Sequence, residues 1–244
     1  MLKLGKGEQT MRIGILKTDS VLPELSQQFG DYPEMFSELL RGAEPSLEVS
    51  VWDMVARERP AKLDDCDGWL ITGSRHSVYE DLPWIRDLES LIREIHESRR
   101  KLVAICFGHQ LVAQVLGGRT GAAARGWTIG VQTMEPMNII GENGLFSAPR
   151  RVIHSHQDQV LELPPGARLL AGNEACPRGV FQIGEHILAI QGHPEFRPDY
   201  ARALYTRRRK ILGEENYSRA VDSLQGGDDA AAIANAMIDF LKKP

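Results

Sequence analysis

The chain has 244 residues, of which 42% are hydrophobic and 25% charged, a composition typical of a folded globular protein rather than a disordered one. This length accommodates one sizeable domain and excludes a catalytic domain fused to a large synthetase. Lys and Arg number 29 against 33 Asp and Glu, a net charge of -4, so neither nucleic acid nor an anionic membrane is an expected partner.

The first half of the chain alternates predicted strands with predicted helices. Short apolar runs predict strands at residues 11–16, 47–54, 68–72 and 102–105. Apolar residues at i, i+3, i+4 and i+7 spacing predict helices at residues 32–40, at 82–99 and between Gly108 and Gly117. Strands that alternate with helices imply parallel βαβ units with both faces of the sheet covered.

The second half changes character. Residues 126–190 contain short strand-like pieces between Gly and Pro turns, which predicts an antiparallel extension. Two helices are predicted to close the chain, at residues 197–212 and 228–241. We therefore expect an α/β fold with a doubly wound, mostly parallel sheet and an antiparallel extension. We expect residues 11–244 to form one domain, preceded by an N-terminal extension at residues 1–10 that could be flexible.

Cysteine usage and hydropathy indicate the compartment. The three cysteines, Cys66, Cys106 and Cys176, are odd in number and widely spaced, so a disulfide framework is not expected. No apolar run approaches the roughly 18 residues that span a bilayer, and residues 1–10 lack the hydrophobic stretch of a secretory signal. We therefore expect a cytoplasmic protein.

Cys106 is the first candidate for catalysis. It directly follows the predicted strand at 102–105 and precedes a predicted helix, the arrangement of a nucleophile elbow. Ala104 and Gly108, two residues away on either side, are small enough to relieve crowding at such a turn. The helix N-terminus would favour the thiolate form. By itself, however, a free cysteine is more often a small buried hydrophobic residue.

His193 and Glu195 are the second candidate group. They follow the apolar run at residues 187–190, and in an extended segment residues i and i+2 point to the same side. The carboxylate could then accept the imidazole N–H and fix its tautomer, as the third member of a triad does. Without Cys106, the better interpretation would be a solvated pair at the end of a strand.

Together these features resemble the class I glutamine amidotransferases of the Cys-His-Glu type. The resemblance extends over residues 11–197 and depends mainly on the blocks Cys-Phe-Gly-His-Gln at 106–110 and Gln-Gly-His-Pro-Glu at 191–195. It is greatest to the stand-alone group of γ-glutamyl peptidases and GMP-synthase-like amidotransferases. It implies a flavodoxin-like fold with Cys106 as nucleophile, His193 as general base and then acid, and Glu195 as the group that orients His193.

The resemblance also implies where the oxyanion would bind. Residues 71–74 match a glycine-rich turn of the family that supplies a backbone N–H, here from Gly73 or Ser74. The second donor would be the N–H of Phe107, because the residue after the nucleophile lies at a helix start with a free amide.

A further block implies a substrate site. Ser-His-Gln-Asp at residues 155–158 resembles a family loop whose backbone holds the glutamyl head, which assigns Ser155 and His156 to substrate binding. Gln110 occupies the position whose side chain also contacts that head in the family.

The implied reaction is cleavage of the γ-glutamyl amide of glutamine, or of another small γ-glutamyl compound, through a cysteinyl thioester that releases glutamate. No cofactor is implied. Beyond the family-like region only about a fifth of the chain remains, too little for an acceptor domain. Two alternatives stay open: a glutaminase subunit that delivers ammonia to a separate synthetase, and a catalytically silent binding module of the same fold.

Three features have no assigned role. The pair His154 and His156 has metal-ligand spacing but no third ligand, so substrate-loop and packing roles are favoured and no metal site is predicted. The basic run at residues 207–210 is either a solvated helix face or a contact for an anion. Trp127 could serve either packing or binding.

Overall fold

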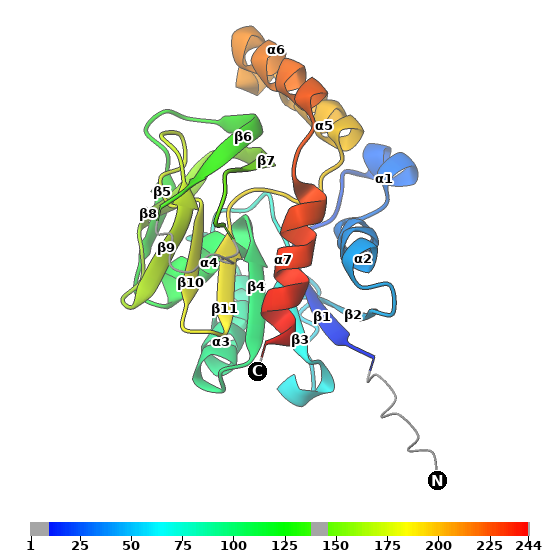
Figure 1. Ribbon diagram of the computed structural model, residues 1–244, viewed down its shortest axis with the longest axis vertical. Helices are drawn as coiled ribbons and strands as arrows, with labels where there is room; N and C mark the ends of the chain where they lie inside the picture. Colours follow the sequence, from blue (N-terminus) through cyan, green and yellow to red (C-terminus); the bar gives the residue numbers. More distant parts are fainter. Residues whose placement is uncertain (1–9, 138–145, 244) are drawn as a thin grey trace.

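A computed structural model describes residues 10–137 and 146–243, and most of its strands form one nine-stranded sheet (Figure 1). The strand order is β2-β1-β3-β4-β11-β10-β9-β6-β7. The first five strands in this order are parallel: β2 (Glu48–Asp53), β1 (Arg12–Lys17), β3 (Gly68–Ile71), β4 (Lys101–Ile105) and β11 (Ile187–Ile190). The other four are antiparallel: β10 (Val180–Ile183), β9 (Ala167–Gly172), β6 (Thr128–Pro136) and β7 (Arg150–His156). The predicted doubly wound sheet with an antiparallel extension is confirmed.

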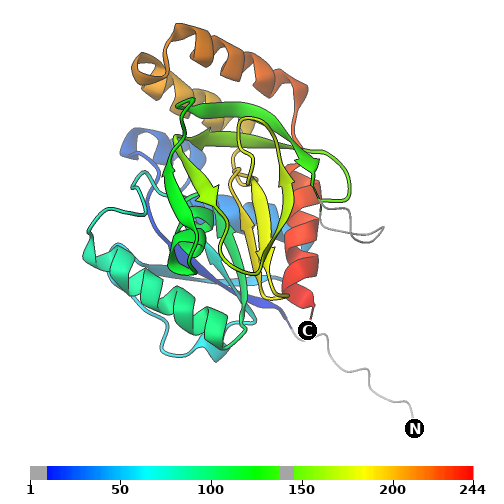
Figure 2. The same ribbon diagram turned by 90° about the vertical axis from the view of Figure 1, so that its left-hand side faces the viewer.

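Helices cover both faces of the parallel half (Figure 2). The helices α2 (Tyr32–Ala43) and α7 (Ala230–Lys242) pack on one face, and α3 (Pro83–Glu97) and α4 (Phe107–Val115) on the other. In β4, Val103 and Ile105 join the core on the α2 and α7 side, whereas Leu102 and Ala104 join the core on the α3 and α4 side. A strand buried on both faces has no polar position, which explains its uninterrupted apolar sequence.

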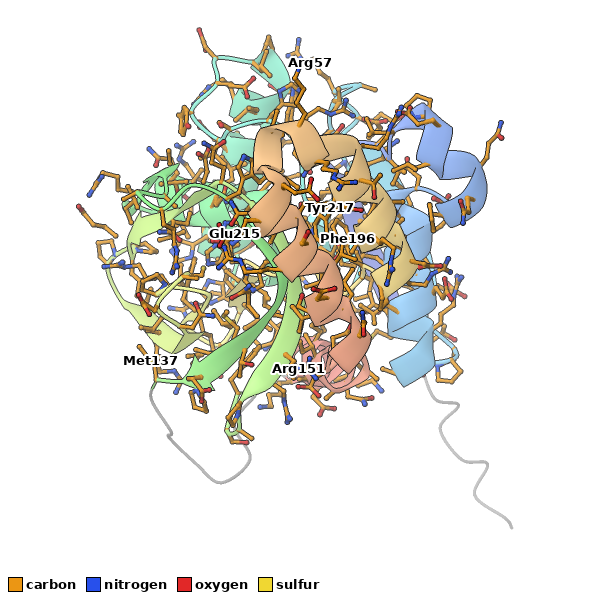
Figure 3. All side chains as sticks on the ribbon, turned by 90° about the horizontal axis from the view of Figure 1, so that it is seen from above. Arg57, Met137, Arg151, Phe196, Glu215 and Tyr217 are labelled. Atoms are coloured by element: carbon orange, nitrogen blue, oxygen red, sulfur yellow. The ribbon has the colours of Figure 1, made fainter. Side chains whose placement is uncertain are left out.

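A third apolar cluster lies at the carboxyl end of the parallel strands. There α1 (Pro23–Phe29), α5 (Pro198–Leu212) and α6 (Glu214–Ser223) pack around the first half of β6 and the end of β7. Figure 3 looks onto this end, where α6 carries Glu215 and Tyr217 across the molecule. Two short 3₁₀ turns, Leu63–Asp65 and Leu224–Gly226, and a separate pair of strands, β5 (Arg119–Ala122) with β8 (Asp158–Glu162), complete the elements.

Several elements differ from the prediction. The helices α1 and α6 and the strand β5 were not predicted, and three helices rather than two close the chain. In α6 only Ala220 is buried, so no apolar stripe marks this helix in the sequence. Residues 1–9 of the predicted N-terminal extension lie outside the described residues. None of the helices in the described ranges is long and apolar enough to cross a membrane.

Candidate active site

Cys106 lies in the sharp turn between β4 and α4. Its backbone has φ 49 and ψ -97, a left-handed conformation that is rare outside glycine. Its N–H donates to the carbonyl of Ile190 on β11 (2.9 Å), and its own carbonyl accepts from the N–H of Gln110 (3.0 Å). A Cβ at Gly108 would lie 2.8 Å from the Cβ of Ile71, so a small residue is required there, as the elbow predicts.

His193 and Glu195 lie together, on the side of the loop that faces Cys106. The Nδ1 of His193 is 2.8 Å from the Oε1 of Glu195, and the Glu195 side chain is fully buried. A Cβ at Gly73 would lie 2.8 Å from Cε1 of His193 and 3.5 Å from Cβ of Cys106, so Gly73 covers both side chains. The ring of Phe196 stacks on the imidazole at 4.0 Å and restricts its orientation.

The charges around His193 outweigh its burial. Burial lowers the pKa of His193, but the neighbouring sulfur of Cys106 and the carboxylate of Glu195 favour the imidazolium, and the net result is a raised pKa. Because Glu195 accepts the Nδ1–H, the Nε2 side of the ring is the one available to Cys106. A proton is therefore held beside the sulfur at neutral pH.

An amide chain reaches the sulfur from another direction. Gln191 Nε2 lies 3.5 Å from Sγ of Cys106, and Gln191 Oε1 accepts from Gln110 Nε2 (3.1 Å). Gln110 Nε2 also donates to the carbonyl of Asp158 (2.7 Å), so both of its N–H groups are used within the protein. Gln110 thus orients Gln191 so that its NH₂ group faces the sulfur. The sequence did not assign this contact.

The turn after β3 presents backbone N–H groups. Thr18 Oγ1, at the end of β1, bonds the carbonyls of Thr72 (3.1 Å) and Gly73 (2.9 Å). In a trans peptide the N–H points away from the preceding carbonyl, so the N–H groups of Gly73 and Ser74 are directed away from Thr18. Phe107 is the first residue of α4, and its N–H has no acceptor within the helix.

These groups border an open pocket of about 150 Å³. It contains Cys106 together with four other residues that the sequence assigned: Ser74, Gln110, Ser155 and His156. The sequence did not assign its remaining lining residues, which are Arg75, His76, Ser77, Trp127, Gln157, Asp158 and Arg208.

His154 and His156 form a buried chain of hydrogen bonds. His156 Nδ1 donates to the carbonyl of Asp158 (2.9 Å), so its Nε2 accepts from His154 Nδ1 (3.0 Å). Burial lowers the pKa of His156 to about 4 and also lowers that of His154, so both rings are neutral. Within residues 10–137 and 146–243, no group of three or more His, Cys, Asp and Glu side chains is placed to hold a metal ion.

Helix geometry divides the basic run between different faces of α5. Arg207 pairs with Glu24 and Arg209 with Glu214, whereas Arg208 turns toward the pocket. Arg208 Nη1 donates to Ser155 Oγ (2.9 Å), and its guanidinium lies 5.4 Å from the ring centre of Trp127. Successive helical residues are rotated by about 100°, so one of several adjacent arginines can face inward alone. Both Trp127 and Arg208 therefore line the pocket.

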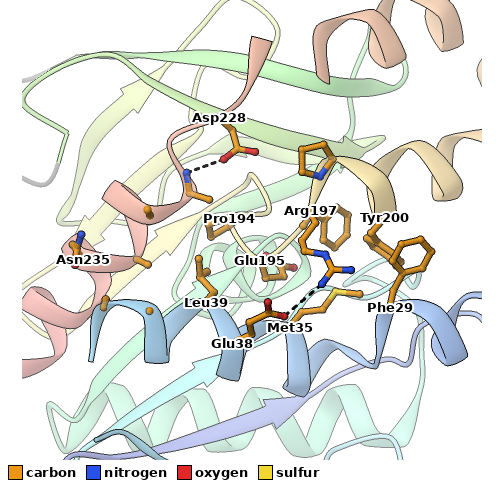
Figure 4. A pocket seen from close by; sticks show the side chains of 17 residues that line it. Phe29, Met35, Glu38, Leu39, Pro194, Glu195, Arg197, Tyr200, Asp228 and Asn235 are labelled. Carbon is orange, nitrogen blue, oxygen red and sulfur yellow. Dashed lines mark hydrogen bonds and ion pairs between the residues drawn. The ribbon is translucent and has the colours of Figure 1, made fainter. Parts of the chain in front are cut away.

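A larger apolar cavity of about 380 Å³ lies behind Glu195, between α2, α7 and the start of α5 (Figure 4). Arg197, which pairs with Glu38 at 3.7 Å, contributes to its lining. The Oε2 atom of Glu195 has no hydrogen-bond partner among the described residues. The carboxylate therefore makes its hydrogen bond through Oε1, to His193.

Comparison with known proteins identifies the family. Residues 31–211 match the family model described as "Glutamine amidotransferase class-I". The chain is 34% identical over 171 residues to Gamma-glutamyl peptidase 3 of Arabidopsis thaliana, an alignment that covers 67% of this chain and 69% of that protein. It is 35% identical over 130 residues to the glutamine-hydrolyzing subunit of GMP synthase from Thermococcus kodakarensis, covering 51% of this chain and 67% of that protein.

Solved structures share the fold. A glutamine amidotransferase from Thermotoga maritima superimposes with a TM-score of 0.75 over 97% of this chain and 100% of that chain, at 18% identity. The chain belongs to the class I glutamine amidotransferase family. It is a class I glutamine amidotransferase-like hydrolase.

Proposed function

We propose that this protein hydrolyses the γ-glutamyl amide bond of a small γ-glutamyl compound, with Cys106, His193 and Glu195 as its catalytic residues. The observation that carries the proposal is the buried His193–Glu195 pair beside a cysteine in a nucleophile elbow. The protonated imidazole stabilises an adjacent thiolate, and the helix N-terminus adds to that effect.

In the first half of the reaction, the thiolate of Cys106 attacks the δ-carbonyl carbon of the γ-glutamyl group. The N–H of Phe107 and an N–H of Gly73 or Ser74 donate to the oxyanion, each contributing about 3 kcal/mol by analogy with other oxyanion donors. His193 gives its proton to the leaving nitrogen, the C–N bond breaks, and the amine departs. The glutamyl group stays bound to Cys106 as a thioester.

In the second half, His193 accepts a proton from water as the water oxygen attacks the thioester. The C–S bond breaks, glutamate leaves, and the thiolate–imidazolium pair is restored. Glu195 keeps the imidazole in the tautomer whose Nε2 faces the sulfur. Gln191 donates to the thiolate and limits its movement.

The pocket supports a small substrate head. Ser155, His156 and Gln110 line the space next to Cys106, and the Arg208 guanidinium has no carboxylate partner in the described part of the chain. A free guanidinium suits the α-carboxylate that every γ-glutamyl group carries. The relatives named as γ-glutamyl peptidases support the choice of a γ-glutamyl compound.

The test is glutamate release from glutamine, glutathione and other γ-glutamyl compounds by the isolated protein. We expect turnover of at least one of them, and we expect Cys106→Ala to reduce it at least a thousandfold while circular dichroism shows a folded protein. Cys66→Ala is the matched control, because Cys66 is a buried free cysteine outside the pocket. Turnover by the Cys106→Ala variant would exclude the mechanism.

A separate synthetase partner would give a different result. Its support is the similarity to the glutamine-hydrolyzing subunit of a GMP synthase. In that case the isolated chain would be inactive and would hydrolyse glutamine only after the synthetase is added. A γ-glutamyl electrophile that labels Cys106 in the isolated chain would separate this outcome from a silent binding module.

A further inference from the structure

A second polar cavity lies next to the catalytic pocket and has no part in the chemistry proposed above. It measures about 350 Å³ and lies between the first half of β6, α6 and Ala175. Trp127 lines both cavities, and Arg208 stacks on it from the catalytic side. We call it the basic pocket, defined by Arg125, Trp127, Thr128, Gln132, Asn216 and Arg219.

The walls of the basic pocket are fixed to each other. Ser223 of α6 accepts a hydrogen bond from the N–H of Val131 on β6 (2.9 Å). A Cβ at Gly130 would lie 2.6 Å from Ser223 Oγ and 2.9 Å from Cα of Ala220, so β6 and α6 are in close contact there. Arg219 on α6 and Arg125 just before β6 are thereby held on the same cavity.

The charge of the basic pocket is positive and unbalanced. Arg125 and Arg219 line it, and no acidic residue does, although the chain as a whole has a net charge of -4. Arg219 donates to Asn216 Oδ1 (2.5 Å), which uses one of its five N–H groups. Within the described residues neither arginine pairs with a carboxylate, whereas Arg207 and Arg209 both do.

A buried hydroxyl group in the same wall also lacks a partner. Thr128 is 4% exposed, and its Oγ1 has no hydrogen-bond partner in the described part of the chain. Buried polar atoms are rarely left unpaired, so this one indicates an additional donor or acceptor such as a bound ligand or water. Thr128 pairs across the sheet with His156, whose side chain lines the catalytic pocket.

We infer that the basic pocket is a second ligand site, which binds a carboxylate or phosphate group adjacent to the reacting bond. The anion has two possible sources. It is either the carboxylate on the leaving half of a γ-glutamyl peptide or a separate small anion. The first source rests on the proposed function, because it requires a γ-glutamyl substrate in the catalytic pocket, whereas the second does not.

The test measures binding rather than turnover. The Cys106→Ala protein is titrated calorimetrically with γ-glutamylglycine, with γ-glutamylglycinamide and with inorganic phosphate. If the substrate supplies the anion, the free carboxylate should bind about tenfold more tightly than the amide, and Arg219→Ala or Arg125→Ala should remove that difference. If the anion is separate, phosphate should bind and weaken about tenfold in the same variants, while the two peptides bind equally.

The matched control is Arg202→Ala, which removes an exposed arginine of α5 outside both cavities. It should leave all three affinities unchanged. If neither peptide discrimination nor phosphate binding depends on Arg125 or Arg219, the inference is wrong. Since no turnover is needed, a protein that hydrolyses nothing but binds phosphate through Arg219 would contradict the proposed function and support the anion site.

Discussion

Two side chains from the segment after β11 face the sulfur of Cys106, and they have different effects. His193 supplies a positive charge, while Gln191 supplies a neutral N–H that is held in place by Gln110. A hydrogen bond to a charged acceptor contributes more than one between neutral groups, so the Gln191 contact should favour thiolate over thiol. At this scale the reactivity of the cysteine depends on a residue outside the proposed triad.

Replacing Gln191 tests that dependence. Gln191→Met keeps the volume but removes the N–H, and we expect alkylation of Cys106 by iodoacetamide at pH 7 to slow about tenfold. At pH 10, where the thiolate forms without help, the rates of the variant and the parent should converge. Gln182→Met, at another buried glutamine, is the control. Equal slowing at both pH values would indicate a packing defect instead.

Gly73 offers a second test at the residue scale. The methyl group of Gly73→Ala would lie 2.8 Å from Cε1 of His193, so the imidazole has to move. A displacement of about 1 Å at a reacting group costs roughly 100-fold, and we expect a loss of this size in kcat/KM for glutamate release. Gly42→Ala on α2, with no atom within 4 Å of its added Cβ, should keep full activity. A Gly73→Ala enzyme with parental kinetics would show that His193 is not constrained by this turn.

At the scale of elements, the junction of β4 and α4 combines a strained residue with close packing. Cys106 adopts a positive φ, which costs a non-glycine residue about 1–3 kcal/mol. The sequence predicts this junction well, because strand, cysteine, small neighbour and helix are consecutive. It does not predict α6, whose position depends on contacts with β6 rather than on its own apolar pattern.

The strain at the junction can be measured. Cys106→Gly should unfold at a higher urea concentration than Cys106→Ala, because glycine adopts positive φ without cost. Allowing for the larger chain entropy of glycine, we expect a difference of about 1 kcal/mol in the free energy of unfolding. Ala104→Gly, at an ordinary strand position of β4 just before the turn, should destabilise the protein. If Cys106→Gly is the less stable of the two variants, the elbow is not strained.

At the scale of the whole molecule, topology brings the candidate site together. β4 and β11 are neighbouring parallel strands, with Ile105 opposite Ile190, so the residues that follow each strand meet at one edge. The sequence motifs identify both segments but not this adjacency, which a family resemblance only implied. Arg208 and Gln191 could not be assigned from sequence, because their roles depend on how α5 and the Gln110 side chain pack across the sheet.

Assembly of the site also buries several histidines without charge, which makes stability dependent on pH. Burial lowers the pKa of His109 to about 3 and that of His156 to about 4, and lowers that of His154 as well. In the unfolded chain these groups titrate near 6.5, so the unfolded state takes up protons first as pH falls. His193, whose pKa is raised, is protonated in both states below pH 6.5 and adds no slope there.

The free energy of unfolding should therefore fall by about 1.4 kcal/mol per pH unit for each of the three histidines as pH drops below 6.5. Between pH 6 and pH 5 the combined loss approaches about 4 kcal/mol, whereas above pH 6.5 these groups contribute no slope. Urea denaturation at pH 7, 6 and 5 measures this loss directly. His109→Gln removes one of the three and should reduce the slope by about a third, because one fewer proton separates the folded from the unfolded state. A profile that stays flat from pH 7 to pH 5 would mean that these rings are not held neutral in the folded protein.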